Sequence, residues 1–120
     1  MLPFPSVAAA VSHALRVHGD APFLGYHRGG GGGGGGGGGR EWDWTTYTYR
    51  RVADEAAALS AGLRAWGVRR RDCVAVASEN RPEWLIADLA CAFGDHLSVG
   101  VHASWSPEKI SAVLDDVDCR

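Results

Sequence analysis

Apolar residues recur at helical spacing in several segments of the chain, most clearly between Tyr49 and Trp66. There the apolar positions follow one another at steps of four, three, four and three, which predicts an amphipathic helix. Thr48 is a suitable N-cap for this helix, and Gly67 is a suitable stop. The face expected to be buried consists of Val52, Ala56, Leu59, Leu63 and Trp66.

Three further helices are predicted from their start and stop residues. The first follows Ser6 as N-cap and ends at Gly19, which can adopt a left-handed conformation there. The second starts at Pro82, runs to about Phe93 and is ended by Gly94. The last is capped by Ser106, with Pro107 in its first turn. Its apolar face contains Ile110, Val113, Leu114 and Val117.

Four segments have the composition of strands. Residues 22–26 and 42–47 are rich in aromatic and β-branched residues and predict the two arms of a hairpin. Residues 73–77 and 97–101 are short apolar runs with little polar alternation, which indicates parallel strands covered on both faces. From residue 48 onward, helices and strands alternate. The predicted fold class is therefore α/β, with an N-terminal helix and β-hairpin before a mostly parallel sheet.

An unbroken run of glycine occupies residues 29–39, at the tip of the predicted hairpin. Fixing a backbone costs roughly 1–2 kcal/mol per residue, and glycines bury no side chain in return, so we expect a disordered loop. The run is no phosphate-binding loop, because lysine and Ser/Thr are missing from the required offsets. The predicted division of the chain is 1–28 (helix and first strand), 29–39 (loop) and 40–120 (partial α/β domain).

Charge and cysteine content exclude some classes of function. A net charge of −2 gives no electrostatic footprint for nucleic acid. The three cysteines are far apart in sequence, and Cys73 and Cys91 stand among apolar residues, which favours free thiols in a reducing compartment. No apolar run is long enough to cross a membrane, although peripheral membrane contact stays open. We expect an intracellular protein, either cytoplasmic or peripheral to an organelle membrane.

Residues 47–120 resemble the early region of the AMP-binding, adenylate-forming superfamily, and among its members most resemble long-chain fatty acyl-CoA ligases. The resemblance is carried by the order and spacing of Tyr47-Thr48-Tyr49, Leu59–Val68, Ser78–Trp84, Ala87–Ala90, Ser106–Ile110 and Val113–Asp116. It implies an enzyme that uses ATP and Mg²⁺ to convert a fatty acid into an acyl-adenylate, which the thiol of CoA then attacks. Residues 6–28 match such proteins more loosely.

The family's chemical motifs have no counterpart in this sequence. They are a Ser/Thr/Gly-rich phosphate loop ending in Pro-Lys-Gly, an adenine-binding aromatic segment, a ribose-binding aspartate and a catalytic lysine. Lys109 is the only lysine and matches no such motif. We therefore assign no catalytic, cofactor-binding or metal residue here. ATP, Mg²⁺ and CoA are expected for the full-length enzyme and not for these 120 residues. The sequence also departs from the family at Arg70-Arg71, Asp95-His96, Gly100 and His102.

Other polar and aromatic residues were weighed as functional groups. His96 and His102 flank a predicted strand at equal parity, but no third metal ligand stands at suitable spacing. Asp95-His96 as a proton relay and Cys91 as a nucleophile are both less favoured than structural roles. Trp84 is expected mainly to pack, with a lipid-facing role as the minor alternative.

Three functional hypotheses follow. The first is the N-terminal part of a long-chain fatty acid–CoA ligase, inactive alone and ending where the alternation predicts another strand. The second is a non-catalytic remnant or interaction module of the same fold. The third, a small nucleotide-binding α/β domain, is least favoured because the turn at 78–81 contains no glycine.

Overall fold

The computed structural model describes residues 4–27 and 44–119, and this part of the chain has the predicted α/β class. The glycine run at 29–39, expected to be a disordered loop, lies outside the described residues, as does Trp42. The elements in order are α1 (Val7–His18), β1 (Pro22–His27), β2 (Trp44–Thr48), α2 (Tyr49–Ala65), β3 (Cys73–Ala77), α3 (Pro82–Gly94), β4 (Leu97–Val101) and α4 (Pro107–Asp116).

Hydroxyl side chains cap three of the helices at the predicted residues. The Ser6 hydroxyl accepts a hydrogen bond from the backbone N–H of Ala9 at 3.1 Å, and Thr48 accepts one from Arg51 at 3.2 Å. Ser106 does the same for the backbone N–H of Lys109 at 3.4 Å. Each bond satisfies one of the amide groups that a helix start leaves without an intrahelical partner. The predictions of these three helix starts are confirmed.

The helix ends differ from the predictions at two of three glycines. Gly67 has φ 96° and ends α2 as expected. Gly19 follows α1, but its φ of 15° and ψ of −81° are not left-handed helical, so that expectation was wrong. Gly94 is still helical, and Asp95 takes the left-handed conformation instead, with φ 58° and ψ 39°. Asp95 is held there because its carbonyl accepts the N–H of Arg71 at 2.6 Å.

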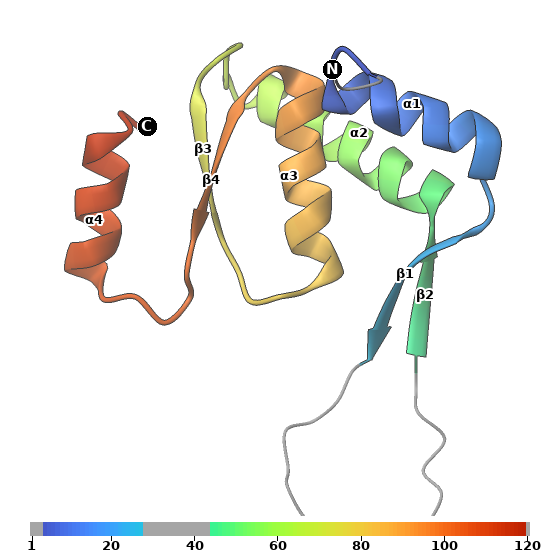
Figure 1. Cartoon of the computed structure of the whole chain (residues 1–120). Coiled ribbons are helices and arrows are strands. Elements are labelled where there is room, and N and C mark those ends of the chain that lie inside the picture. The colour runs from blue at the N-terminus through green and yellow to red at the C-terminus, as the bar shows by residue number, and fades with distance from the viewer. Residues whose placement is uncertain (1–3, 28–43, 120) are drawn as a thin grey trace, which may run out of the picture.

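The hairpin and two helices enclose the main core. β1 and β2 pair antiparallel, with Gly25 opposite Thr46, which confirms the predicted hairpin. Figure 1 shows the hairpin extending from the ends of α1 and α2, with α2 beside α3. The buried cluster between these elements consists of Tyr47, Val52, Ala56, Ile86, Leu89 and Ala90.

The buried face of α2 is rotated from the predicted one. Leu59 is 38% exposed and Trp66 is 85% exposed, so placing them on the buried face was wrong. The buried residues are Val52, Ala53, Ala56 and Ser60. Small side chains at 56 and 60 let α2 approach α3 closely, and the larger Leu59 then lies at the side of the contact. Hydrophobic periodicity predicts that Leu59 is buried, but it cannot predict burial of a polar residue such as Ser60.

β3 and β4 pair in parallel, with Cys73 opposite Leu97 and Ala77 opposite Val101. The pairing confirms the predicted connection through a helix, but the expectation of strands covered on both faces was wrong. Figure 1 shows α3 on one side of the pair and α4 on the other. No residue of α4 is buried, and Ala75, Ala77 and Leu97 are exposed. The helix on the α4 side covers the strands incompletely.

Candidate functional site

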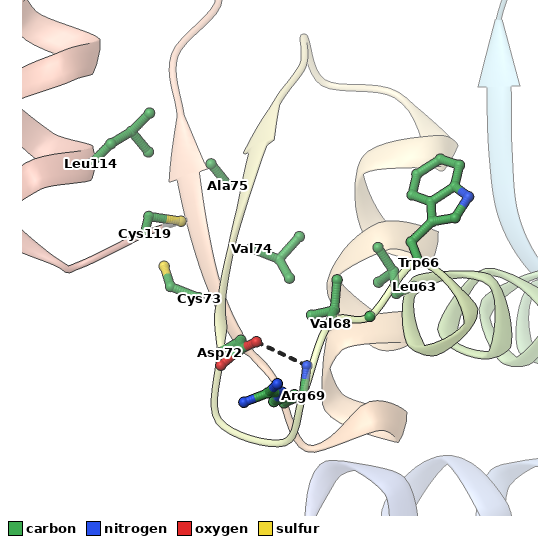
Figure 2. Close-up of a pocket in the computed structure, with 11 residues that line it drawn as sticks. Leu63, Trp66, Val68, Arg69, Asp72, Cys73, Val74, Ala75, Leu114 and Cys119 are labelled. Carbon is green, nitrogen blue, oxygen red and sulfur yellow. Dashed lines mark hydrogen bonds between the residues drawn. The ribbon is translucent and has the colours of Figure 1, made fainter.

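A groove between β3, the end of α2 and α4 has a volume of about 630 Å³. Apolar side chains form most of its walls: Leu63, Val68, Val74, Ala75 and Leu114. Figure 2 shows Leu114 on α4 facing Ala75 of β3 across the opening. The groove therefore lies where α4 covers β3 only incompletely.

The polar groups at the lower end of the groove are already engaged. The Asp72 carboxylate accepts the backbone N–H of Arg69 at 2.9 Å, the bond drawn in Figure 2. The Arg69 carbonyl is bonded in turn to Nδ1 of His96, also at 2.9 Å. These bonds hold the turn between α2 and β3.

Two thiols face each other at the α4 side of the groove. Figure 2 shows the sulfur atoms of Cys73 and Cys119 pointing toward one another. Burial and a hydrogen bond with the Cys119 thiol raise the pKa of the Cys73 thiol to about 11. Cys91 is buried in α3, where burial raises its thiol pKa and disfavours the nucleophilic thiolate. Cys73 and Cys91 are both buried, as the apolar residues around them predicted.

The histidines that were weighed as a metal pair are not brought together. His96 is buried just before β4, whereas His102 follows the other end of β4 and interacts with the Ser104 hydroxyl at 2.9 Å. Asp95 pairs with Arg70 at 2.8 Å and not with His96, so the alternative of a proton relay has no support. Across the described residues, no three His, Cys, Asp or Glu side chains lie close enough to hold a metal ion.

Trp84 and Lys109 occupy structural surroundings. Trp84 is half-buried and lines a second hollow of about 340 Å³ together with Leu24 and Tyr26 of the hairpin. The Lys109 ammonium lies 4.2 Å from the centre of the Trp105 ring, which is a cation–π contact within α4 and the loop before it. Neither residue points to a reaction.

The turn between β3 and α3 does not fit the phosphates of ATP. A phosphate cradle needs a glycine-rich turn from a strand into a helix, with free N–H groups at the helix start. The turn between β3 and α3 contains no glycine, and Pro82 in the first turn of α3 has no N–H to donate. Arg81 beside it is engaged with Glu83 at 3.2 Å. We therefore derive no chemical step through ATP from these residues.

Comparison with known proteins identifies the family. The AMP-binding enzyme family matches residues 13–120. Long chain acyl-CoA synthetase 7, peroxisomal, from Arabidopsis thaliana is 33% identical over 108 residues, which cover 90% of this chain and 14% of that protein. Long-chain-fatty-acid–CoA ligase 6 from Mus musculus is 29% identical over 111 residues, which cover 87% of this chain and 14% of that protein.

Solved structures agree with this assignment at the level of the fold. The N-terminal subdomain of NpsA from Klebsiella oxytoca superposes with a TM-score of 0.78 at 23% identity, covering 98% of this chain and 26% of that one. The fatty acid AMP ligase from Legionella pneumophila gives 0.79 at 15% identity, covering 98% and 19%. The chain belongs to the AMP-binding enzyme family, and it spans 14% of the length of the two relatives named above.

The feature that sequence reasoning missed is the meeting of Cys73 and Cys119. The two residues are remote in sequence, and neither belongs to a recognisable motif. The only available signal was topological, since one cysteine starts a strand and the other follows the helix that returns past it.

For the described residues, no helix is long and apolar enough to cross a membrane.

Proposed function

We propose that the chain is the N-terminal part of an ATP-dependent long-chain fatty acid–CoA ligase and that it acts as a folding scaffold with no activity of its own. The Arabidopsis relative is a long chain acyl-CoA synthetase and the mouse relative is a long-chain-fatty-acid–CoA ligase, which supports the fatty acid and CoA specificity. The motif order from Tyr47 to Asp116 supports the placement within the family.

The incompletely covered parallel strands are the observation that carries the scaffold role. Leu97 is 52% exposed, no residue of α4 is buried, and the groove between α4 and β3 is lined mainly by apolar groups. Contiguous apolar surface of this kind marks a contact site in a soluble protein. A pair of strands with open edges is likewise suited to lie within a larger sheet.

The chemistry of the proposed enzyme would lie in residues other than those described here. Fatty acid, ATP with Mg²⁺ and CoA are its proposed substrates and cofactors. No catalytic, cofactor-binding or metal residue is assigned to this chain, because positions 1–120 contain no Ser/Thr/Gly-rich loop ending in Pro-Lys-Gly and no lysine in a catalytic motif. Residues 40–120 would form part of the AMP-binding domain, and this division remains a prediction.

Activity assays on the 120-residue protein test whether the chain has no activity of its own. ATP with Mg²⁺ is titrated into the protein by calorimetry, and pyrophosphate release is then measured with a long-chain fatty acid and CoA. The intact Arabidopsis relative serves as the positive control. We expect neither binding nor release from the chain. Saturable binding with release that depends on fatty acid would refute the scaffold role.

A chimera tests whether the chain can serve as the N-terminal part of such a ligase. The matched segment of the Arabidopsis relative is replaced by this chain, and acyl-CoA formation is compared with that of a variant lacking the segment. We expect activity above the deletion variant. The competing hypothesis is an interaction module of the same fold, and a folded, soluble chimera without activity would favour it.

A further inference from the structure

The geometry points to a reversible disulfide site formed by Cys73 and Cys119, which would fasten the end of α4 to β3 across the groove. We propose that a small-molecule disulfide of the glutathione type is the oxidant. This site goes beyond the proposed function, because it depends only on how α4 sits against the strands.

Both cysteines are held on a fixed backbone. Cys73 opens β3, and its neighbour Asp72 accepts the N–H of Leu97 at 3.0 Å through its carbonyl, which ties this end of β3 to β4. Cys119 follows Asp118, whose φ of 48° turns the chain back at the end of α4. The N–H of Cys119 then donates to the carbonyl of Leu114 at 2.9 Å. This closing turn of the helix aims the Cys119 side chain at β3.

The two thiols face each other, and the third cysteine is elsewhere. The facing sulfur atoms in Figure 2, together with the influence of Cys119 on the pKa of the Cys73 thiol, indicate that no large backbone movement is needed to join them. Cys91 lies in α3, on the other side of the strands from α4, and is only 1% exposed. Pairing should therefore be selective for Cys73 with Cys119.

The exposures of the two cysteines set the order of events. Cys119 is half-buried whereas Cys73 is buried, so the oxidant meets Cys119 first. The Cys119 thiolate attacks one sulfur of glutathione disulfide, and one glutathione thiolate leaves. The Cys73 thiolate then attacks the Cys119 sulfur of the mixed disulfide, and the second glutathione leaves. Two protein thiols and one glutathione disulfide thus give one protein disulfide and two glutathione thiols.

The second step requires the thiolate of Cys73. Burial raises the pKa of the Cys73 thiol, so its thiolate fraction near neutral pH is small and grows about tenfold per pH unit. Proximity compensates for the small fraction because the attack is intramolecular. Formation of the Cys73–Cys119 disulfide should therefore accelerate as the pH rises from 7 to 9, whereas excess dithiothreitol should reduce the disulfide again.

Mapping the bond by mass spectrometry tests the proposal. The native protein is equilibrated with glutathione redox buffers, alkylated, and digested without reduction by trypsin together with a glutamate-specific protease. These enzymes place the cysteines on separate peptides, 72–79, 84–108 and 110–120. We expect peptides 72–79 and 110–120 to be linked, and the link to form at least about tenfold more favourably in native protein than in urea.

Three variants make the result decisive. Cys91→Ser should leave the link unchanged, whereas Cys73→Ser and Cys119→Ser should each abolish it. Cys119→Ser is the stronger test because position 119 is only half-buried and its loss should not unfold the chain. A link that includes Cys91, a stable mixed disulfide at Cys119 without closure, or equal pairing in native and unfolded protein would overturn the proposal. None of these outcomes bears on the proposed role of the chain as a scaffold in a larger ligase.

Discussion

Replacing Gly94 with alanine should destabilise the protein, although alanine favours helices. Gly94 is the last residue of α3 and packs against the buried ring of His96. A Cβ added there would lie 2.3 Å from Nε2 of His96 and 3.0 Å from the hydroxyl of Ser60. Both distances are shorter than van der Waals contact allows, so the ring or the helix must shift. The ring cannot turn away freely because its Nδ1 is bonded to the Arg69 carbonyl.

The expected magnitude follows from two opposing effects. Overpacking a close contact costs roughly 1–3 kcal/mol, and the gain in helix propensity returns roughly 0.5–1 kcal/mol. The net loss in free energy of unfolding should be about 1–2 kcal/mol. Gly62→Ala is the matched control, because Gly62 lies inside α2 with nothing within 4 Å of an added Cβ. That variant should gain about 0.5–1 kcal/mol.

Urea denaturation followed by far-UV circular dichroism and tryptophan fluorescence measures both variants. The double variant Gly94→Ala/His96→Ala completes a thermodynamic cycle, in which removing the ring should recover part of the loss caused by Gly94→Ala. If Gly94→Ala is as stable as the unchanged protein while Gly62→Ala is stabilised, the packing argument at His96 is refuted.

Three other predictions concern the core, a buried hydroxyl and a surface ion pair. Val52→Ala should lower the free energy of unfolding by about 2 kcal/mol, because Val52 is 1% exposed. Val113→Ala on α4 should lower it by less than about 0.5 kcal/mol, and equal losses in urea denaturation would contradict the weak packing of α4. Ser60→Ala should raise the free energy of unfolding by about 1 kcal/mol, since the buried hydroxyl has no hydrogen-bond partner; a loss in the same assay would mean that it has one. Arg70 lowers the pKa of the Asp95 carboxyl, so their pair stabilises the fold at neutral pH and this contribution is lost as the pH falls below about 4. The melting temperatures of the unchanged protein and of Asp95→Asn should therefore converge between pH 7 and pH 3, and a constant difference would argue against the ion pair.

Local signals in the sequence were sufficient to place the elements. Hydroxyl caps, prolines and apolar runs predicted each helix start and each strand to within a few residues, because these choices depend on neighbours in sequence. Burial was harder to predict. Hydrophobic periodicity places Leu59 on the buried face of α2, but the residue buried by the close approach of α3 is Ser60. Which residue is buried depends on how the two helices pack, and the sequence of α2 alone does not encode that packing.

For strand β3, the sequence predicts more burial than the structure shows. Cys73–Ala77 has the uninterrupted apolar composition of a strand buried on two faces, yet Ala75 and Ala77 are exposed in the 120-residue protein. Composition indicates the surroundings for which a segment is suited, and the fold determines which of those surroundings this stretch of chain supplies. The difference between them measures apolar surface that another element could cover.

The groove beside β3 therefore links the two proposals in a way that experiment can separate. An element packed onto β3 and α4 would shield Cys119, which is half-buried in the chain alone. Oxidation by glutathione disulfide would then slow, because its first step requires access to that thiol. The rate of forming the Cys73–Cys119 link in the active chimera, compared with the 120-residue protein, reports whether the groove is covered. A much slower rate in the chimera would place the groove inside the larger domain, and an equal rate would leave it as an exposed surface on which the thiol pair can act as a switch.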